Sequence, residues 1–113
     1  EPALAPTLHA ALAAGKAVDV SVSGIAADAL GAKRVGSIAL PITQQYVQQS
    51  LLLSDASIRA AQLWLWQHLQ IACEASAALG LAALQTGVYK PTKEETVCLV
   101  ICGANLDIAS LQT

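Results

Sequence analysis

The residue types best suited to chemistry stand in the turn Cys102-Gly103-Ala104-Asn105, directly after the apolar run Thr96–Ile101. The run is rich in β-branched residues and predicts a buried strand, and ligands of open α/β sheets bind beyond the carboxyl ends of strands. Glycine lets the backbone approach a ring or phosphate closely, and an uncharged cysteine can hydrogen-bond a ring nitrogen. The turn therefore predicts a ligand site, although an ordinary strand-to-helix turn with a buried cysteine has the same pattern.

A second candidate is Glu74, the only acidic residue between Asp55 and Glu94. A carboxylate in so apolar a stretch must be paired, exposed or part of a site. The alternative role is that of a helix-start carboxylate, which the helix dipole favours.

A third candidate is Gly24, which follows an extended run, although a simple turn would also place a glycine there. His9 and His68 have no Cys, Asp or Glu at ligand spacing, so the sequence indicates no metal or general-base role for them. P-loop, GxGxxG and catalytic-triad patterns are absent from the sequence.

The composition excludes several classes of protein. Six Lys and Arg against eight Asp and Glu give a net charge of −2, which disfavours nucleic acid as a partner. No apolar run reaches about eighteen residues, so neither a transmembrane helix nor a membrane partner is expected. Cys73, Cys98 and Cys102 form neither a disulfide framework nor a zinc spacing, which favours a reducing, cytoplasmic compartment. Since the sequence has neither an initiator Met nor a signal peptide, we expect it to be a piece of a longer polypeptide.

Helical segments are predicted by capping residues and by the spacing of apolar residues. Ser54 caps the longest helix, on which Ile58, Ala61 and Leu65 follow the i, i+3, i+4 pattern. This helix is apolar on nearly all faces, so we expect it to be buried on several sides. The other expected helical segments are Thr7–Ala14, Ile25–Leu30, Pro41–Gln49, Glu74–Gln85 and a short one capped by Asp107.

Three extended segments alternate with these helices, namely Val18–Val22, Leu51–Leu53 and Thr96–Ile101. Strands separated by helices indicate a parallel sheet, so we predict an α/β fold in three layers, with a few parallel strands flanked by helices. So small a sheet has open edges, and only 12% of the residues are charged. We therefore expect a homo-oligomer or a strand-swapped assembly.

Taken together, these segments resemble the fold type II pyridoxal-phosphate-dependent serine/threonine dehydratases, a group that includes threonine ammonia-lyase and serine racemase. The similar stretches are Leu12–Gly36 (LAAGKAVDVSVSGIAADALGAKRVG), Leu51–Leu84 (LLLSDASIRAAQLWLWQHLQIACEASAALGLAAL) and Val97–Asn105 (VCLVICGAN). The resemblance covers essentially the whole chain in order. It implies that residues 1–113 are a single C-terminal segment, about one third, of such an enzyme and belong to its large domain.

The resemblance also implies roles for five residues. Cys102 would face the pyridine nitrogen of the cofactor, and Gly103 would line the cofactor beside it. Gly24 and Ile25 would correspond to the loop near the cofactor ring, and Glu74 to the glutamate near the cofactor pocket. A neutral partner such as cysteine would avoid full protonation of the ring, which suits elimination chemistry.

A cation site that some members use would correspond to Glu1 and the backbone carbonyl of Ala5. The third ligand of that site, an acid in serine racemase, falls on Thr7. Two further departures from the family pattern are Ala75, where the family has proline, and Ala104, where it has the second glycine of its terminal turn.

The lysine that holds the cofactor covalently lies near the N-terminus of the family, as does the glycine-rich phosphate loop, and neither has a counterpart here. The lysines of this chain do not match the motif of that residue; they are Lys16, Lys33, Lys90 and Lys93. We therefore assign no catalytic residue and expect this chain alone to bind no cofactor.

The function that the resemblance implies is that of a lyase of amino-acid metabolism, which converts L-threonine or L-serine to a 2-oxo acid and ammonia. We expect the chain alone to be inactive and to need a missing N-terminal part. The alternative is a non-catalytic α/β module that self-associates through its apolar helices and strand edges.

Overall fold

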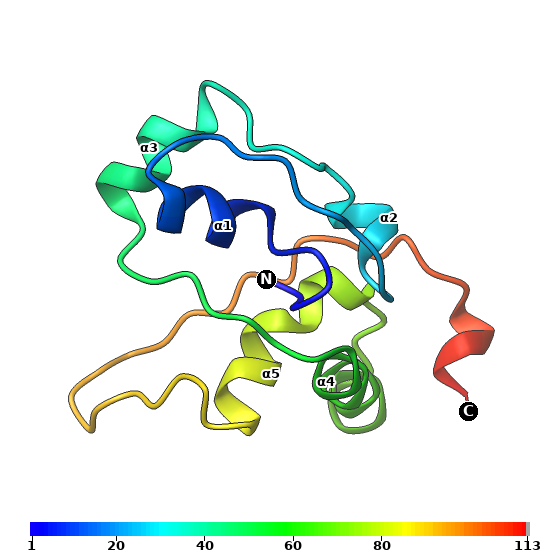
Figure 1. Cartoon of the computed structure of the whole chain (residues 1–113). Helices are drawn as coiled ribbons and strands as arrows, with labels where there is room; N and C mark the ends of the chain where they lie inside the picture. The colour runs from blue at the N-terminus through cyan, green and yellow to red at the C-terminus, as the bar shows by residue number, and fades with distance from the viewer. Residues whose placement is uncertain (113) are drawn as a thin grey trace.

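The computed structural model describes residues 1–112, which form short helices joined by long extended segments (Figure 1). The helices are α1 (Thr7–Ala14), α2 (Ala27–Leu30), α3 (Ala39–Tyr46), α4 (Asp55–Leu69) and α5 (Leu79–Gln85), with two 3-10 helices, η1 (Ala75–Ala78) and η2 (Ile108–Leu111). Within this part of the chain, no helix has both the length and the apolar character needed to cross a membrane.

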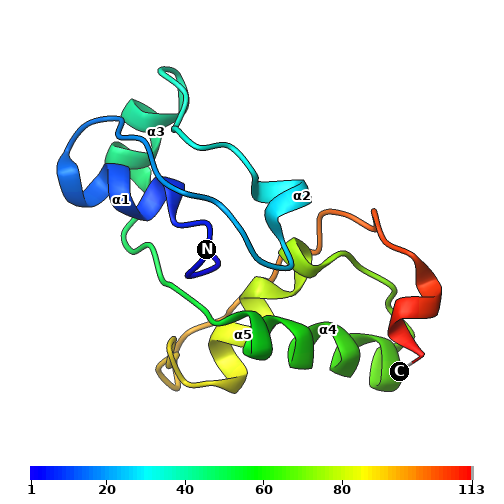
Figure 2. The ribbon, with the colours of Figure 1, turned by 45° about the vertical axis from the view of Figure 1, so that its right-hand side comes forward.

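Helix α4 is the longest element, and α5 lies beside it (Figure 2). The Ser54 hydroxyl accepts a hydrogen bond from the Ser57 N–H at 3.2 Å, which confirms the predicted cap. At the other end Gln70 has a left-handed backbone, φ 56°, and its N–H bonds to carbonyls of the last turn. Leu69 is 53% exposed, so the expected burial of this helix on several sides does not extend to its last turn.

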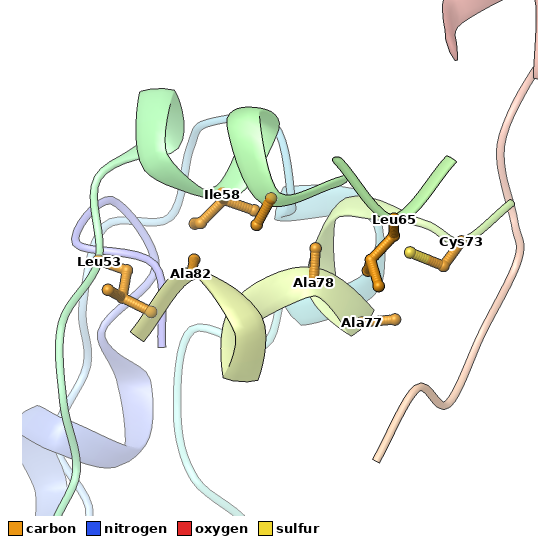
Figure 3. Close-up of a cluster of buried hydrophobic side chains, with 8 residues drawn as sticks. Leu53, Ile58, Leu65, Cys73, Ala77, Ala78 and Ala82 are labelled. Carbon is orange, nitrogen blue, oxygen red and sulfur yellow. The ribbon is translucent and has the colours of Figure 1, made fainter. Parts of the chain in front are cut away.

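The main core lies between α4 and the segment formed by η1 and α5 (Figure 3). Ile58 and Leu65 point from α4 toward Ala78 and Ala82, and all four side chains are buried. Because alanine is small, the two segments approach closely and leave little unfilled space. The other buried members of this core are Leu53, Ala61, Cys73 and Ala77.

The helix at the start of the chain has the bounds that the sequence predicted. Helix α1 runs from Thr7 to Ala14, and Gly15 ends it with φ 67°, a left-handed conformation that glycine adopts at no steric cost. Helix α3 begins at Ala39 rather than at Pro41, because proline within the first turn lacks only an N–H that would have no helical partner.

The end of α3 and the start of the segment after α4 differ from the prediction. Helix α3 ends at Tyr46 instead of Gln49, because the backbone of Val47 is extended. The helix predicted from Glu74 begins as the 3-10 helix η1, with Glu74 as the residue before it, and becomes α-helical only at Leu79.

The three predicted strands do not form a sheet among residues 1–112. The segments Val18–Val22, Leu51–Leu53 and Thr96–Ile101 are extended, but no ladder of backbone hydrogen bonds joins them. The prediction that Thr96–Ile101 is a buried strand is wrong here, since Val100 is 77% exposed. The physical reason is that within the described residues no neighbouring segment supplies backbone partners on either side.

One parallel pairing is present in the described chain, between its first residues and the segment before α4. The Leu53 N–H donates to the Glu1 carbonyl at 2.9 Å, and the Ala3 N–H donates to the Leu53 carbonyl at 2.8 Å, which forms a parallel bridge between Pro2 and Leu53. The N-terminal ammonium donates to the Leu51 carbonyl at 2.7 Å. The predicted strand direction is therefore seen only at this bridge.

The molecule is flat and exposes much of its surface. Its extents are 40 × 36 × 20 Å and its radius of gyration is 14.5 Å, against about 13 Å for a compact domain of 100 residues. Its accessible surface of 6998 Å² exceeds the roughly 5,800 Å² typical of a compact monomer of this mass. The excess follows from the extended segments, which contact few neighbours.

Two leucines of α4 provide a test of this core. We expect Leu65→Ala to lower the free energy of unfolding by about 2–5 kcal/mol, because it empties the buried space beside the η1 alanines. The matched variant Leu69→Ala, on the same helix but exposed, should lower it by less than about 1 kcal/mol. Urea denaturation followed by circular dichroism measures both, and equal losses would contradict the placement of the core.

Candidate functional site

Two distant segments of the chain meet at the carboxylate of Glu74. The Ser76 hydroxyl donates to Oε1 at 2.6 Å, and the Asn105 N–H donates to Oε2 at 3.0 Å. The Glu74 N–H donates to the Gly103 carbonyl at 3.0 Å. We call this group of contacts the Glu74 clamp. It joins the start of η1 to the turn after residues 96–101, so the structure brings together Glu74 and Gly103, two of the predicted site residues.

The clamp explains why residue 103 is glycine. A Cβ atom built there would lie 2.6 Å from the carboxyl carbon of Glu74 and 2.8 Å from each of its oxygens. Any larger residue would push the carboxylate away from Ser76 and Asn105. The group that closely approaches the Gly103 backbone is a side chain of the protein itself, and the predicted approach to a ring or phosphate stays a prediction.

The hydrogen bonds of the clamp favour the charged form of Glu74. Donation from Ser76, and then from the Asn105 backbone, holds the pKa of the Glu74 carboxyl below its ordinary value, while burial acts in the opposite direction. The pKa of the adjacent Cys73 thiol is raised, chiefly by burial, with the charges of Glu74 and Cys102 adding to the effect. At neutral pH the cluster therefore holds one carboxylate beside a neutral thiol.

Cys102 lies next to the clamp and has an exposed side chain with a free thiol. The sequence left open an ordinary turn with a buried cysteine. Cys102 is exposed, so the burial assumed in that alternative is not seen here, and ligand binding at this turn stays a prediction. The buried cysteine of the chain is Cys73 instead. An exposed cysteine side chain can contact a ligand that approaches this turn.

Gly24 and Ile25 form a second loop, which is held by α4. The Ile25 N–H donates to Oδ2 of Asp55 at 2.9 Å, and Gly24 has φ +89°. A hollow of about 270 Å³ is bordered by Ile25 from this loop and by Ala75 and Asn105 from the two sides of the Glu74 clamp. Ile25 and the two residues that flank the Glu74 clamp therefore border a common space. The roles of Gly24, Ile25 and Glu74 at a cofactor stay predictions.

Sequence reasoning missed two polar residues of α4 that border the same hollow. Gln62 is buried, and its amide nitrogen donates to the Cys73 carbonyl at 2.7 Å. Arg59 donates to the Gln62 side-chain oxygen at 2.7 Å and also to the Ser110 carbonyl. A glutamine among apolar residues on the buried face of a helix is a signal that could have identified Gln62, because buried amides need partners.

The residues predicted for a cation site lie at the start of α1. The Glu1 carboxylate accepts the N–H groups of Leu8 and His9 at 2.9 and 2.6 Å, and Ser50 donates to it at 3.4 Å. It therefore caps the first turn of the helix. Ala5 is buried nearby, and residues 1–112 contain no group of three or more His, Cys, Asp or Glu side chains that could hold a metal ion. The site at Glu1 and Ala5 stays a prediction.

Comparison with known proteins gives clear similarities over almost the whole chain. A family model described as "Pyridoxal-phosphate dependent enzyme" matches residues 1–103. The chain is 34% identical over 106 residues to the biosynthetic L-threonine dehydratase of Pasteurella multocida, and this match covers 93% of this chain and 21% of that protein. It is 32% identical over 111 residues to the L-threonine ammonia-lyase of Geobacter sulfurreducens, which covers 98% of this chain and 27% of that protein.

Solved structures give the same result. Maize serine racemase superposes with a TM-score of 0.87 at 29% identity, over 99% of this chain and 35% of that structure. A threonine deaminase from T.th. superposes with a TM-score of 0.84 at 27% identity, over 95% of this chain and 39% of that structure. The chain thus spans between about a fifth and two fifths of the proteins it matches. The predicted resemblance to threonine dehydratases and serine racemases is confirmed.

The charge of Glu74 gives a pH-dependent prediction. Because the folded state lowers the pKa of this carboxyl, its contribution to stability is fully present above the ordinary carboxyl pKa and is lost as the pH falls through the lowered value. Glu74→Gln should therefore lower the urea midpoint at neutral pH, and the difference from the unchanged chain should shrink as the solution is acidified.

The matched control is Glu94→Gln, which changes an exposed residue of the loop before Thr96. It should leave the urea midpoint nearly unchanged across the same pH range. A Glu74→Gln difference that stays constant or grows on acidification would contradict the hydrogen-bonded carboxylate.

Proposed function

Because the chain belongs to the pyridoxal-phosphate dependent enzyme family, we propose that it forms one wall of the cofactor site of a lyase that acts on L-threonine or L-serine. The Glu74 clamp is the observation that carries this proposal. It fixes the turn that carries the exposed Cys102, and Asn105 of that turn borders one hollow together with Ile25. The names of the relatives support the substrate class, since they are L-threonine dehydratases and ammonia-lyases.

The residues at the turn fit pyridoxal phosphate by their chemistry. The exposed Cys102 thiol would contact the pyridine nitrogen as a neutral group, and Gly103 leaves the backbone free of a side chain beside it. When bound, the cofactor supplies an electron sink for the loss of the α-proton and then of water from a hydroxy amino acid. A neutral partner at this place would leave the ring nitrogen without a full positive charge.

The other residues of this wall would position the turn and exclude water. The Glu74 carboxylate accepts hydrogen bonds from Ser76 and Asn105, so its role would be to fix the turn that presents Cys102. Ile25 closes the opposite side of the hollow with an apolar side chain, which helps to exclude water.

We propose further that the chain corresponds to a C-terminal segment of the large α/β domain of such an enzyme. The TM-scores to serine racemase and threonine deaminase support this placement. The extended segments would be strands of the complete parallel sheet, with partners supplied by the remaining part of the fold. In the resembling enzymes the covalent lysine lies in that remaining part, so the chain alone would neither hold the cofactor covalently nor turn over substrate.

The proposal is tested with a chimera. The matched segment of the Geobacter sulfurreducens L-threonine ammonia-lyase is replaced by this chain, so that the relative supplies the lysine. We expect the chimera to release ammonia from L-threonine and to show the absorbance of bound cofactor, and we expect this chain alone to do neither. Cys102→Asp should lower kcat at least about tenfold, because a charged partner changes the protonation of the ring.

The matched control in the chimera is Cys102→Ser, which keeps a small group without a permanent charge at the same position. Steady-state ammonia release by this chain alone would overturn the argument from the missing lysine. A folded, cofactor-loaded chimera in which Cys102→Asp and Cys102→Ser have equal effects would overturn the role given to Cys102.

A second candidate function is a non-catalytic module that associates with copies of itself. It is favoured by the apolar side chains that the fold leaves exposed. Ile38, Ile42 and Tyr46 are 78%, 53% and 72% exposed and follow one another at helical i, i+4 spacing along α3. Val100 is exposed on a segment with open backbone groups, which a second chain could pair.

Self-association predicts a concentration-dependent mass. If this function is correct, sedimentation equilibrium at micromolar concentrations should give a mass of at least two chains, and Ile42→Asp should shift it toward one chain of 11.6 kDa. The control Leu69→Asp, at an exposed leucine of α4, should not. A monomer across the whole concentration range would exclude the self-associating module and would leave the first proposal, one wall of the cofactor site of a lyase.

A further inference from the structure

Asp55 joins the start of α4 to the loop of Gly24 and Ile25, which lies thirty residues earlier in the sequence. It is the first residue of the helix, and its Oδ2 atom accepts the Ile25 N–H at 2.9 Å. An acidic residue at a helix start is favoured by the dipole wherever its side chain points. The position of the helix start alone therefore does not require the contact with Ile25.

The space beside Gly24 shows how closely the Asp55 carboxylate approaches the loop. A Cβ atom at residue 24 would lie 2.6 Å from Oδ2 and 3.0 Å from Oδ1 of Asp55. The backbone of Gly24 also has φ +89°, a conformation that L side chains rarely adopt. The Asp55 carboxylate and the Gly24 backbone are thus fitted to each other, and both the space and the dihedral angle require glycine.

The second carboxylate oxygen of Asp55 carries a free-energy cost. Oδ1 is buried and accepts no hydrogen bond from residues 1–112. A buried acceptor without a partner costs free energy that a solvent-exposed acid at the same helix start would avoid. In the same orientation of the side chain, the other oxygen, Oδ2, accepts the hydrogen bond from the Ile25 N–H.

The remaining backbone contacts of the loop do not fix Ile25. The Ser23 N–H donates to the Leu4 carbonyl at 2.9 Å, and the Ala27 N–H donates to the Gly24 carbonyl at 3.2 Å. They hold the two ends of the loop, while Asp55 holds its middle. Ile25 is also the residue that borders the hollow opposite Ala75 and Asn105.

We propose that Asp55 is a positioning residue that sets the distance of the Gly24–Ile25 loop from the Glu74 clamp, and thereby the width of the cofactor site; this use of the loop rests on the proposed function. Asp55 itself acts through the loop and does not contact the hollow-lining turn. The proposal predicts that the place of the carboxylate matters more than its charge.

Two variants separate the effect of the position of the Asp55 carboxylate from the effect of its charge. Asp55→Glu keeps an acid at the helix start but moves the carboxylate by one methylene from its place beside the Gly24 backbone. Asp55→Asn keeps the size and one acceptor oxygen for Ile25, and its amide nitrogen can take the place of the unpartnered oxygen. Ser54→Ala is the matched control, because it removes the cap of the same helix without touching the loop.

The readout is hydrogen exchange of the Ile25 amide, measured by NMR on the full chain without cofactor. We expect exchange relative to the unchanged chain to be at least about tenfold faster in Asp55→Glu and less than about threefold faster in Asp55→Asn and Ser54→Ala. The amide of Asn105, which Glu74 holds, should serve as an internal reference and change little in all three.

Two outcomes would overturn the proposal: an Ile25 amide in Asp55→Glu that exchanges as slowly as in the unchanged chain, or one that is accelerated equally by Ser54→Ala. The first outcome would mean that Asp55 acts only as an acid at the helix start. The second would mean that the loop depends on the helix cap as a whole rather than on Asp55. In the chimera, Asp55→Glu should raise KM for L-threonine more than it lowers kcat. A chimera without activity would count against the proposed function, while the exchange result would still decide the role of Asp55.

Discussion

Helix α4 and its packing against η1 and α5 are the constraint on which the rest of the structure depends. Three polar side chains of α4 each form a hydrogen bond with a segment from elsewhere in the chain. Asp55 holds the Ile25 loop, Gln62 holds the carbonyl of Cys73 just before Glu74, and Arg59 holds the carbonyl of Ser110. Because Ile58 and Leu65 are locked between the two segments, these attachment points are fixed relative to one another.

This arrangement accounts for how residues distant in sequence come to border one hollow. The clamp at Glu74 adds the last link, since its carboxylate takes donors from both η1 and the turn after residues 96–101. Glycine at positions 24 and 103 is required by the same kind of contact, a carboxylate placed where a Cβ atom would lie. Both glycines thus lie against acidic side chains of the protein, Asp55 at Gly24 and Glu74 at Gly103.

The open side of the molecule has a simple physical origin. Extended backbone is stabilised by ladders with neighbouring strands, and within residues 1–112 the only β-pairing is an isolated bridge between Pro2 and Leu53. The solved relatives are between about two and a half and three times as long, judged by the 35% to 39% of them that this chain covers. The exposed apolar residues of segment 96–101 and of α3 therefore lie where a further chain segment, or a second chain, could be accommodated.

Local features of the chain were predictable from the sequence. The bounds of α1, the Ser54 cap and the apolar face of α4 follow from residue type and spacing over a few neighbours, and the structure confirms them. The family could also be predicted, because the stretches that resemble it run in order along the whole chain. Glu74 and Gly103 were identified as candidates because an isolated acid and a glycine after an apolar run are unusual locally.

Only the tertiary structure decided which groups meet. Nothing in the sequence indicates that Glu74 contacts Ser76 and Asn105, that Asp55 holds Ile25, or that Gln62 reaches Cys73, because each contact depends on how α4 packs. The strands were predicted from β-branched runs that are real, yet a run determines only that a segment is extended. Whether it becomes a strand depends on a partner for its N–H and C=O groups, and that partner is a property of the assembled fold rather than of the segment.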